Sequence, residues 1–110
     1  ESYEGGKQYV NDYQVTLSQF IDTWSASVYE SLDDLFLKDN EKVIADAVLT
    51  LFRTRHDIEI FKKKALYIYI REMTDCETPH LTRVISILKE DFKKKYQNLY
   101  DQGLITNKPL

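Results

Sequence analysis

The sequence is poor in glycine, proline and cysteine. Its 110 residues include three glycines, two prolines and one cysteine. The glycines are Gly5, Gly6 and Gly103, so the chain lacks the glycine-rich loop that binds nucleotide phosphates after a strand. A single cysteine forms no disulfide within the chain, which favours a reducing compartment such as the cytoplasm. The two histidines, His56 and His80, do not have the spacing of a zinc site. We therefore predict no metal, no other cofactor and no enzymatic activity.

Long apolar runs are missing as well. No stretch approaches the roughly 20 apolar residues that a membrane-spanning helix needs. Apolar residues still make up 43% of the chain and charged residues 30%, which is typical of a globular domain. We predict one domain over residues 1–110, with flexible tails at 1–7 and 104–110 and no membrane segment.

Apolar residues recur at steps of three or four along most of the chain, which is the spacing of amphipathic helices. Neither proline nor glycine occurs between Lys7 and Thr78, so helices can run long and end at polar clusters. The pattern predicts an all-α fold, a small bundle of about four helices. These helices are expected near residues 8–37, 41–53, 57–74 and 78–101.

The first predicted helix has the longest apolar stripe, from Val10 through Trp24 and Val28 to Leu35. This stripe is longer than a small helical head covers, and an apolar stripe left in water favours association. We therefore expect Trp24 and Val28 to be buried, either against the later helices or in an interface. That interface would be a homodimer or a contact with another protein through residues 8–37.

Two further local signals concern the later helices. Residues 67–70, Tyr-Ile-Tyr-Ile, have the composition of a strand, but helical spacing continues on both sides, so we predict a helix there. Thr78 followed by Pro79 indicates a helix start, and Gly103 indicates a helix end.

Residues 70–84, IREMTDCETPHLTRV, combine two helical stripes with a short polar break. The segment resembles the helix-turn-helix pattern of bacterial and phage DNA-binding proteins, I-A-x-x-x-G-V-S-x-x-x-V-S-R-φ, in which φ is apolar. The matching positions are Ile70 in the first helix, Cys76 in the turn, Leu81 and Val84 on the buried side of the second helix, and Thr82-Arg83 on its DNA-facing side. The resemblance implies a helix-turn-helix within residues 61–95 whose second helix enters the major groove.

Two positions depart from that pattern. Arg71 stands where the family prefers alanine, and Asp75 stands where it prefers the turn glycine. Aspartate adopts the left-handed backbone more readily than most residues, so Asp75 is compatible with the turn.

The two halves of the chain differ in charge. Residues 1–50 hold 3 basic and 10 acidic side chains, whereas residues 51–110 hold 12 basic and 8 acidic ones. A basic half suits a polyanion, with the acidic half turned away from it. The formal net charge of −3 indicates modest non-specific affinity for DNA.

These observations predict a transcription regulator or DNA-marking factor of bacterial or phage type that binds double-stranded DNA. The predicted base contacts are Thr78, His80, Thr82, Arg83 and Ser86. The predicted phosphate contacts are Arg55, Lys62, Lys63, Lys64, Lys89 and Lys93. We expect replacement of Arg83 by alanine to weaken specific DNA binding without disturbing folding, because Arg83 lies off the apolar stripe.

Other interpretations remain open. The lysine runs 62–64 and 93–95 can instead be solvated helix faces, which is the more common role of such runs, and Arg83 and His80 can be solvated surface residues. The alternative function is a helical structural or adaptor protein that binds other proteins through its amphipathic helices. A docking face of that kind would carry exposed aromatic residues or leucines, and the outer face of the fourth helix carries hydrogen-bonding residues instead.

Overall fold

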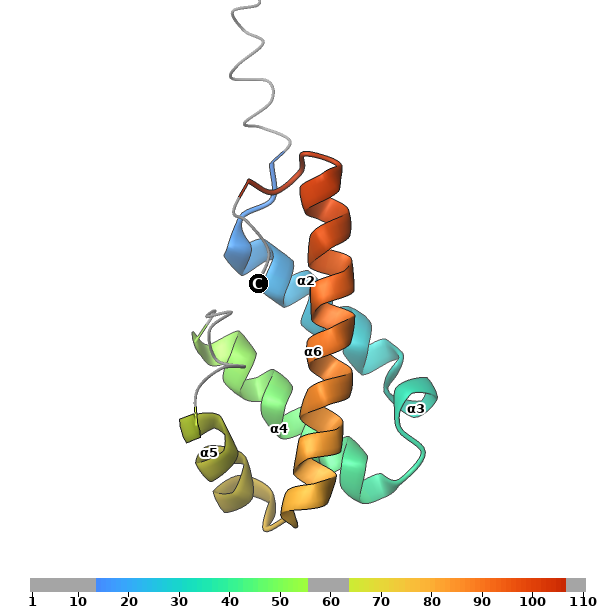
Figure 1. Cartoon of the computed structure of the whole chain (residues 1–110), viewed down its shortest axis with the longest axis vertical. Coiled ribbons are helices and arrows are strands. Elements are labelled where there is room, and N and C mark those ends of the chain that lie inside the picture. Colours follow the sequence, from blue (N-terminus) through green and yellow to red (C-terminus); the bar gives the residue numbers. More distant parts are fainter. Residues whose placement is uncertain (1–13, 56–63, 107–110) are drawn as a thin grey trace, which may run out of the picture.

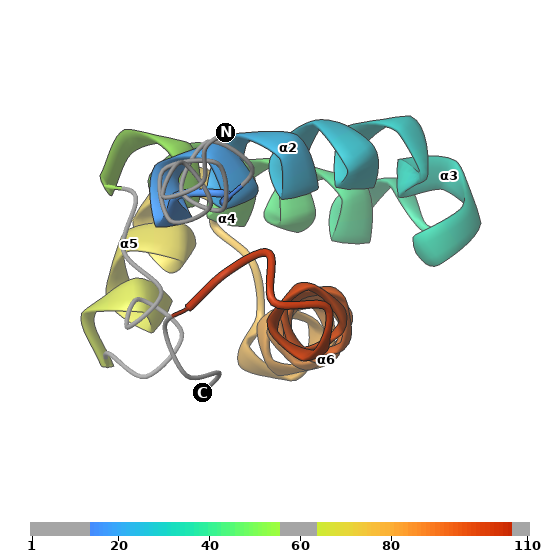
Figure 2. The ribbon, with the colours of Figure 1, turned by 90° about the horizontal axis from the view of Figure 1, so that it is seen from above.

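The computed structural model describes residues 14–55 and 64–106 and shows an all-α bundle (Figure 1). The helices are α2 (Leu17–Glu30), α3 (Leu32–Leu35), α4 (Asp39–Arg55), α5 (Lys64–Thr74) and α6 (Thr78–Asp101). Within those two ranges there is no strand. Helix α4 is central, because it contacts α2, α5 and α6. Seen from above, α2 and α4 lie side by side in one layer, and α5 and α6 lie below it (Figure 2).

The three later helices are confirmed for the residues described. Residues 67–70 are helical within α5, so the helical spacing outweighed the local strand composition. Helix α6 begins at Thr78 with Pro79 in its first turn. It ends at Asp101, and Gly103 follows its C-cap residue as predicted, with a φ of 74° and an N–H that donates to the Tyr100 carbonyl at 3.1 Å. Residues 57–63 of the predicted third helix lie outside the described residues.

The single first helix predicted over residues 8–37 is wrong in its bounds. Residues 14–16 are not helical, and residues 8–13 lie outside the described residues. Helix α2 starts after Thr16, whose side chain accepts from the Gln19 N–H at 3.1 Å while the Gln19 side chain accepts from the Thr16 N–H at 2.9 Å. This reciprocal capping box fixes the start of the helix. At the other end α2 stops before Ser31, and α3 adds a single short turn.

The apolar stripe of α2 and α3 is buried against other helices of the same chain. Trp24 and Val28 are buried, at 2% and 0% exposure, as predicted. The Phe92 ring centroid lies 5.0 Å from those of both Trp24 and Phe20, in edge-to-face geometry. Leu17, Leu32 and Leu35 pack partly buried against the same core. For the described residues, therefore, burial of this stripe needs no second protein, and the dimer stays a prediction.

The prediction of a flexible tail over residues 104–110 is wrong for its first residues. The Leu104 carbonyl accepts from the Val15 N–H at 2.7 Å, and Ile105 is 2% exposed in the core. The Leu104 N–H also donates to the Leu99 carbonyl at 2.9 Å, which closes the turn after α6. Residues 104–105 thus pack on the bundle because an apolar residue follows the helix-ending glycine. Residues 1–7 and 107–110 lie outside the described residues. In the part of the chain that the structure describes, none of the helices has the length and apolar character that crossing a membrane requires.

Candidate nucleic-acid interface

A three-residue turn, Asp75–Glu77, joins α5 to α6. Asp75 has a φ of 51°, in the left-handed region, and its N–H donates to the Arg71 carbonyl at 2.8 Å. A left-handed residue directly after a helix redirects the chain, and aspartate tolerates this backbone better than most residues. Asp75 therefore takes the conformation for which the helix-turn-helix pattern prefers glycine.

The apolar positions of the pattern are on the inside of the bundle. Ile70 of α5 and Leu81 and Val84 of α6 are each fully buried, and Cys76 of the turn is partly buried against the core. Arg71, at the position where the pattern prefers alanine, is exposed. It therefore does not disturb the packing of α5 and α6.

One face of α6 carries a line of polar side chains, which we call the outer row. It consists of Thr78, Thr82, Ser86, Lys89 and Lys93. Steps of four, four, three and four residues put these side chains on one side of the helix. The three hydroxyl residues are exposed, and the two lysines are half-buried. The outer row thus presents hydroxyl groups in the first turns of α6 and ammonium groups farther along.

Arg83 is held by a residue that the sequence did not single out. Its Nε donates to Oε2 of Glu41, in the first turn of α4, at 2.8 Å. The Glu41 side chain is only 4% exposed, whereas that of Arg83 is 60% exposed. Removal of Arg83 would therefore leave a buried carboxylate without its partner. Because of this contact we expect the Arg83→Ala variant to lose stability, contrary to the expectation from its position off the apolar stripe.

A signal for Glu41 was present in the sequence. Glu41 precedes Ile44, Val48 and Phe52 at steps of three, four and four, so it continues the apolar stripe of α4. An acidic residue on such a stripe faces the core, and a buried charge needs a partner.

His80 lies apart from the other predicted base contacts. It is half-buried and lines an open hollow of about 420 Å³ between the first turns of α4 and the α5–α6 turn. The other lining residues are Asn40, Val43, Ile44, Thr74, Asp75, Cys76 and Glu77. Because His80 is two residues from both Thr78 and Thr82, it points away from the outer row. The structure therefore does not bring His80 together with the hydroxyl residues of α6.

Of the predicted phosphate contacts in the middle of the chain, the structure places one side chain. Lys64 is the first residue of α5 and is exposed. Lys62 and Lys63 lie outside the described residues. Arg55 is the last residue of α4, and its side chain is likewise outside the described part.

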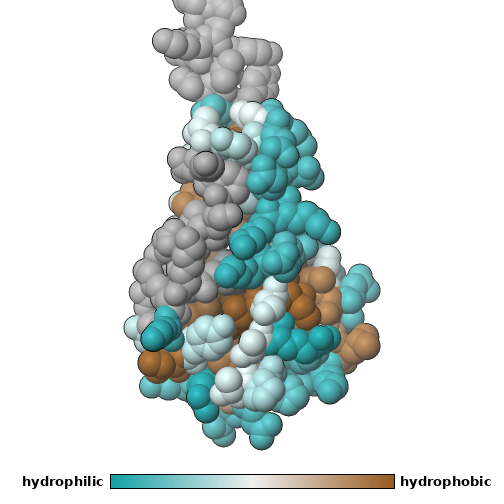
Figure 3. Space-filling view, in the orientation of Figure 1, coloured by the Kyte–Doolittle hydropathy of each residue, from teal (hydrophilic) through white to brown (hydrophobic). Residues whose placement is uncertain are grey.

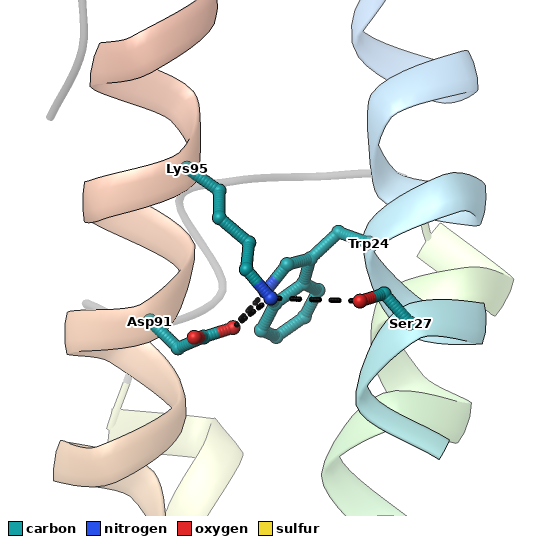
Figure 4. Close-up of polar contacts among 4 residues, drawn as sticks. All are labelled: Trp24, Ser27, Asp91 and Lys95. Atoms are coloured by element: carbon teal, nitrogen blue, oxygen red, sulfur yellow. Dashed lines mark hydrogen bonds and ion pairs between the residues drawn. The ribbon is translucent and has the colours of Figure 1, made fainter. Parts of the chain in front are cut away.

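Lys95, the last residue of the second lysine run, faces α2 (Figure 4). Its Nζ lies 3.1 Å from Oδ2 of Asp91 and 3.5 Å from the Ser27 hydroxyl. The same Asp91 oxygen accepts from the Trp24 indole N–H at 2.9 Å. Lys95 therefore helps to hold α2 against α6, and Lys93 is the lysine of this run that lies in the outer row.

The described residues offer no metal centre. Within residues 14–55 and 64–106, no three His, Cys, Asp or Glu side chains are grouped so that they could hold a metal ion. Comparison of the chain with protein-family models, with curated proteins and with solved structures finds no match.

Proposed function

We propose that the chain binds double-stranded DNA through the outer row of α6, as a transcription regulator or DNA-marking factor. The observation that carries this proposal is the order of side chains along that row, with hydroxyl groups first and ammonium groups after them. Thr82 and Ser86, in the N-terminal half of α6, carry hydroxyl groups that bond to base edges. Lys89 and Lys93, one and two turns farther on, carry the ammonium groups that bind phosphates.

The dimensions of α6 suit this arrangement. A helix rises about 1.5 Å per residue, so Lys89 lies roughly 10 Å along the axis from Thr82. The major groove is about 12 Å wide and admits a helix. With Thr82 at the base edges, Lys89 and Lys93 would reach the phosphates that flank the groove.

The N-terminus of α6 itself is a poor place for phosphate. Glu77 is the N-cap residue, Asp75 lies two residues before it, and both are exposed. Their carboxylates occupy the positive end of the helix dipole and repel another anion. The phosphate contacts are therefore assigned to the lysine end of the outer row.

The proposal is tested by a mobility-shift titration against random-sequence duplex DNA at two salt concentrations. Binding should weaken as salt rises, with a slope that reports the number of phosphates neutralised. Lys93→Ala should lower that slope by about one. Lys38→Ala, which removes an exposed lysine in the loop before α4, is the matched control and should leave the slope unchanged. Binding that is absent, or that responds equally to both variants, would refute the proposal.

Protein binding through α5 is a second candidate function, because this helix carries large exposed apolar side chains. Ile68 is 58% exposed and Met73 is 52% exposed. Figure 3 shows apolar side chains at the surface at the lower left, over α5, whereas hydrophilic ones cover much of α6. Ile68→Ser should leave DNA binding unchanged if α6 alone contacts DNA. If the chain is an adaptor, the unaltered protein should fail to bind DNA in the same titration.

A further inference from the structure

The contact between Glu41 and Arg83 fixes one side of an exposed guanidinium. Glu41 is set in α4, the central helix, and its backbone N–H donates to the Lys38 carbonyl at 3.1 Å. With its side chain 4% exposed, its carboxylate has little room to turn toward another partner. The Nε–H of Arg83 is therefore anchored from inside the bundle.

The rest of the Arg83 guanidinium is available for a second partner. A guanidinium carries five N–H donors in a planar fork, and the contact to Glu41 uses the one on Nε. Four donors remain on Nη1 and Nη2, and the side chain is 60% exposed. The pair of terminal nitrogens matches O6 and N7 of guanine, which arginine bonds with two parallel hydrogen bonds.

We propose that Glu41 is a positioning residue that holds Arg83 for a guanine in the major groove. This inference rests on the proposed DNA binding through α6, since Arg83 lies three residues before Ser86 of the outer row and is therefore its neighbour on the helix surface. An arginine held at Nε loses less rotamer freedom when its terminal nitrogens bind a base. Glu41 thus contributes to base selection although it is buried and does not touch DNA.

Charge separates this role from a purely structural one. The carboxylate of Glu41 offsets the positive charge of Arg83, so the pair adds little attraction for phosphates at large. Replacement of Glu41 by an uncharged residue removes one negative charge, which should leave non-specific affinity unchanged or raise it. The same replacement should reduce the preference for guanine. If the replacement only destabilised the fold, the non-specific affinity and the affinity for the guanine-containing site would fall together.

The test is a selection of bound duplexes from a random-sequence DNA pool, followed by affinity measurements on the selected site and on the site with that guanine replaced. The unaltered protein should prefer guanine at one position by roughly 5- to 150-fold, the range for one bidentate pair. Glu41→Met, which has no acceptor, should lower this preference by at least about fivefold and leave other positions selected. Glu41→Gln keeps an acceptor for Nε and should restore part of the preference. Asp39→Asn, a charge-matched change of an exposed residue in the same turn of α4, should have no effect.

Arg83→Lys keeps the test decisive if Glu41→Met folds poorly. It retains a cation beside Glu41 but loses the planar fork, so guanine preference should fall while non-specific affinity stays. Unchanged guanine preference in Glu41→Met, or in Arg83→Lys, would overturn this inference and leave the proposed DNA binding standing. A selection without any guanine preference would overturn it as well. Failure of the unaltered protein to bind any duplex would overturn the proposed function, and this inference with it.

Discussion

The two partners of the Glu41–Arg83 contact should differ sharply in what their removal does to stability. Arg83→Met leaves the carboxylate of Glu41, 4% exposed, in the bundle without its cation. Breaking a buried pair in this way lowers the free energy of unfolding by about 3–5 kcal/mol, and we expect the lower end because Arg83 is 60% exposed. Glu41→Met leaves a guanidinium that water can solvate and puts an apolar side chain into the core. Glu41→Met should therefore change the free energy of unfolding by no more than about 1 kcal/mol.

The measurement is urea denaturation followed by far-UV circular dichroism, with the free energy of unfolding extrapolated to water. The double variant Glu41→Met/Arg83→Met should be close to the unaltered protein or more stable, because neither charge remains. The loss in Arg83→Met should therefore be recovered by the second substitution. Equal stability of the two single variants would refute the reasoning. It would mean that water or another group satisfies the carboxylate of Glu41 once Arg83 is gone.

Three further changes test other features of the bundle. Tyr96→Phe should raise the free energy of unfolding by about 1–3 kcal/mol, because the Tyr96 hydroxyl is buried with no hydrogen-bond partner among the described residues. Burial also raises the pKa of Tyr96 above its ordinary value of 10.0, so the folded state holds this proton more tightly than the unfolded state does. The unaltered protein should therefore lose more stability than the Tyr96→Phe variant as pH rises through and above 10.0. Equal losses of stability at alkaline pH would contradict this. Asp75→Gly should be neutral or stabilising by up to about 1 kcal/mol in thermal melts, since φ is 51° there, and a clear loss would show that the aspartate side chain is needed. Gly103→Ala should lower stability by about 1–2 kcal/mol through its positive φ alone, because the added Cβ would meet no atom within 4 Å beyond its chain neighbours. An unchanged melting temperature would contradict strain at this turn.

The helices of the second half could be predicted because their boundaries depend on local chemistry. Pro79 after Thr78 and Gly103 after the last helical turn act within a few residues of themselves. The first segment shows the limit of periodicity, because its apolar steps continue across both ends of α2. The Thr16–Gln19 pair is itself a capping signature, and attention to it would have placed the start of α2 from the sequence.

In the candidate site, the exposure of residues could be predicted from the sequence, but their long-range partners could not. Thr82 and Ser86 were placed on the exposed side of α6 because they lie off its apolar stripe, and the structure has them exposed. The contact of Arg83 with Glu41 joins residues 42 positions apart, and that of Trp24 with Asp91 joins residues 67 positions apart. Periodicity shows which side of a helix is buried, but the choice of partner depends on how the helices pack.

These two long-range contacts also explain how α6 presents its outer row. Near its N-terminus, Arg83 bonds to α4, and farther along, Asp91 bonds to Trp24 of α2. The second contact lies on the side of α6 that faces the bundle, and between the two points Leu88 is fully buried. A helix held at both positions and along its apolar face has little freedom to rotate, so Thr82 and Ser86 stay on the outside. Base recognition requires side chains held within a fraction of an ångström of their working geometry, and a rigid helix provides that better than a loop does. The polar contacts between these helices therefore serve the proposed DNA-binding surface by fixing the rotation of the helix that carries it.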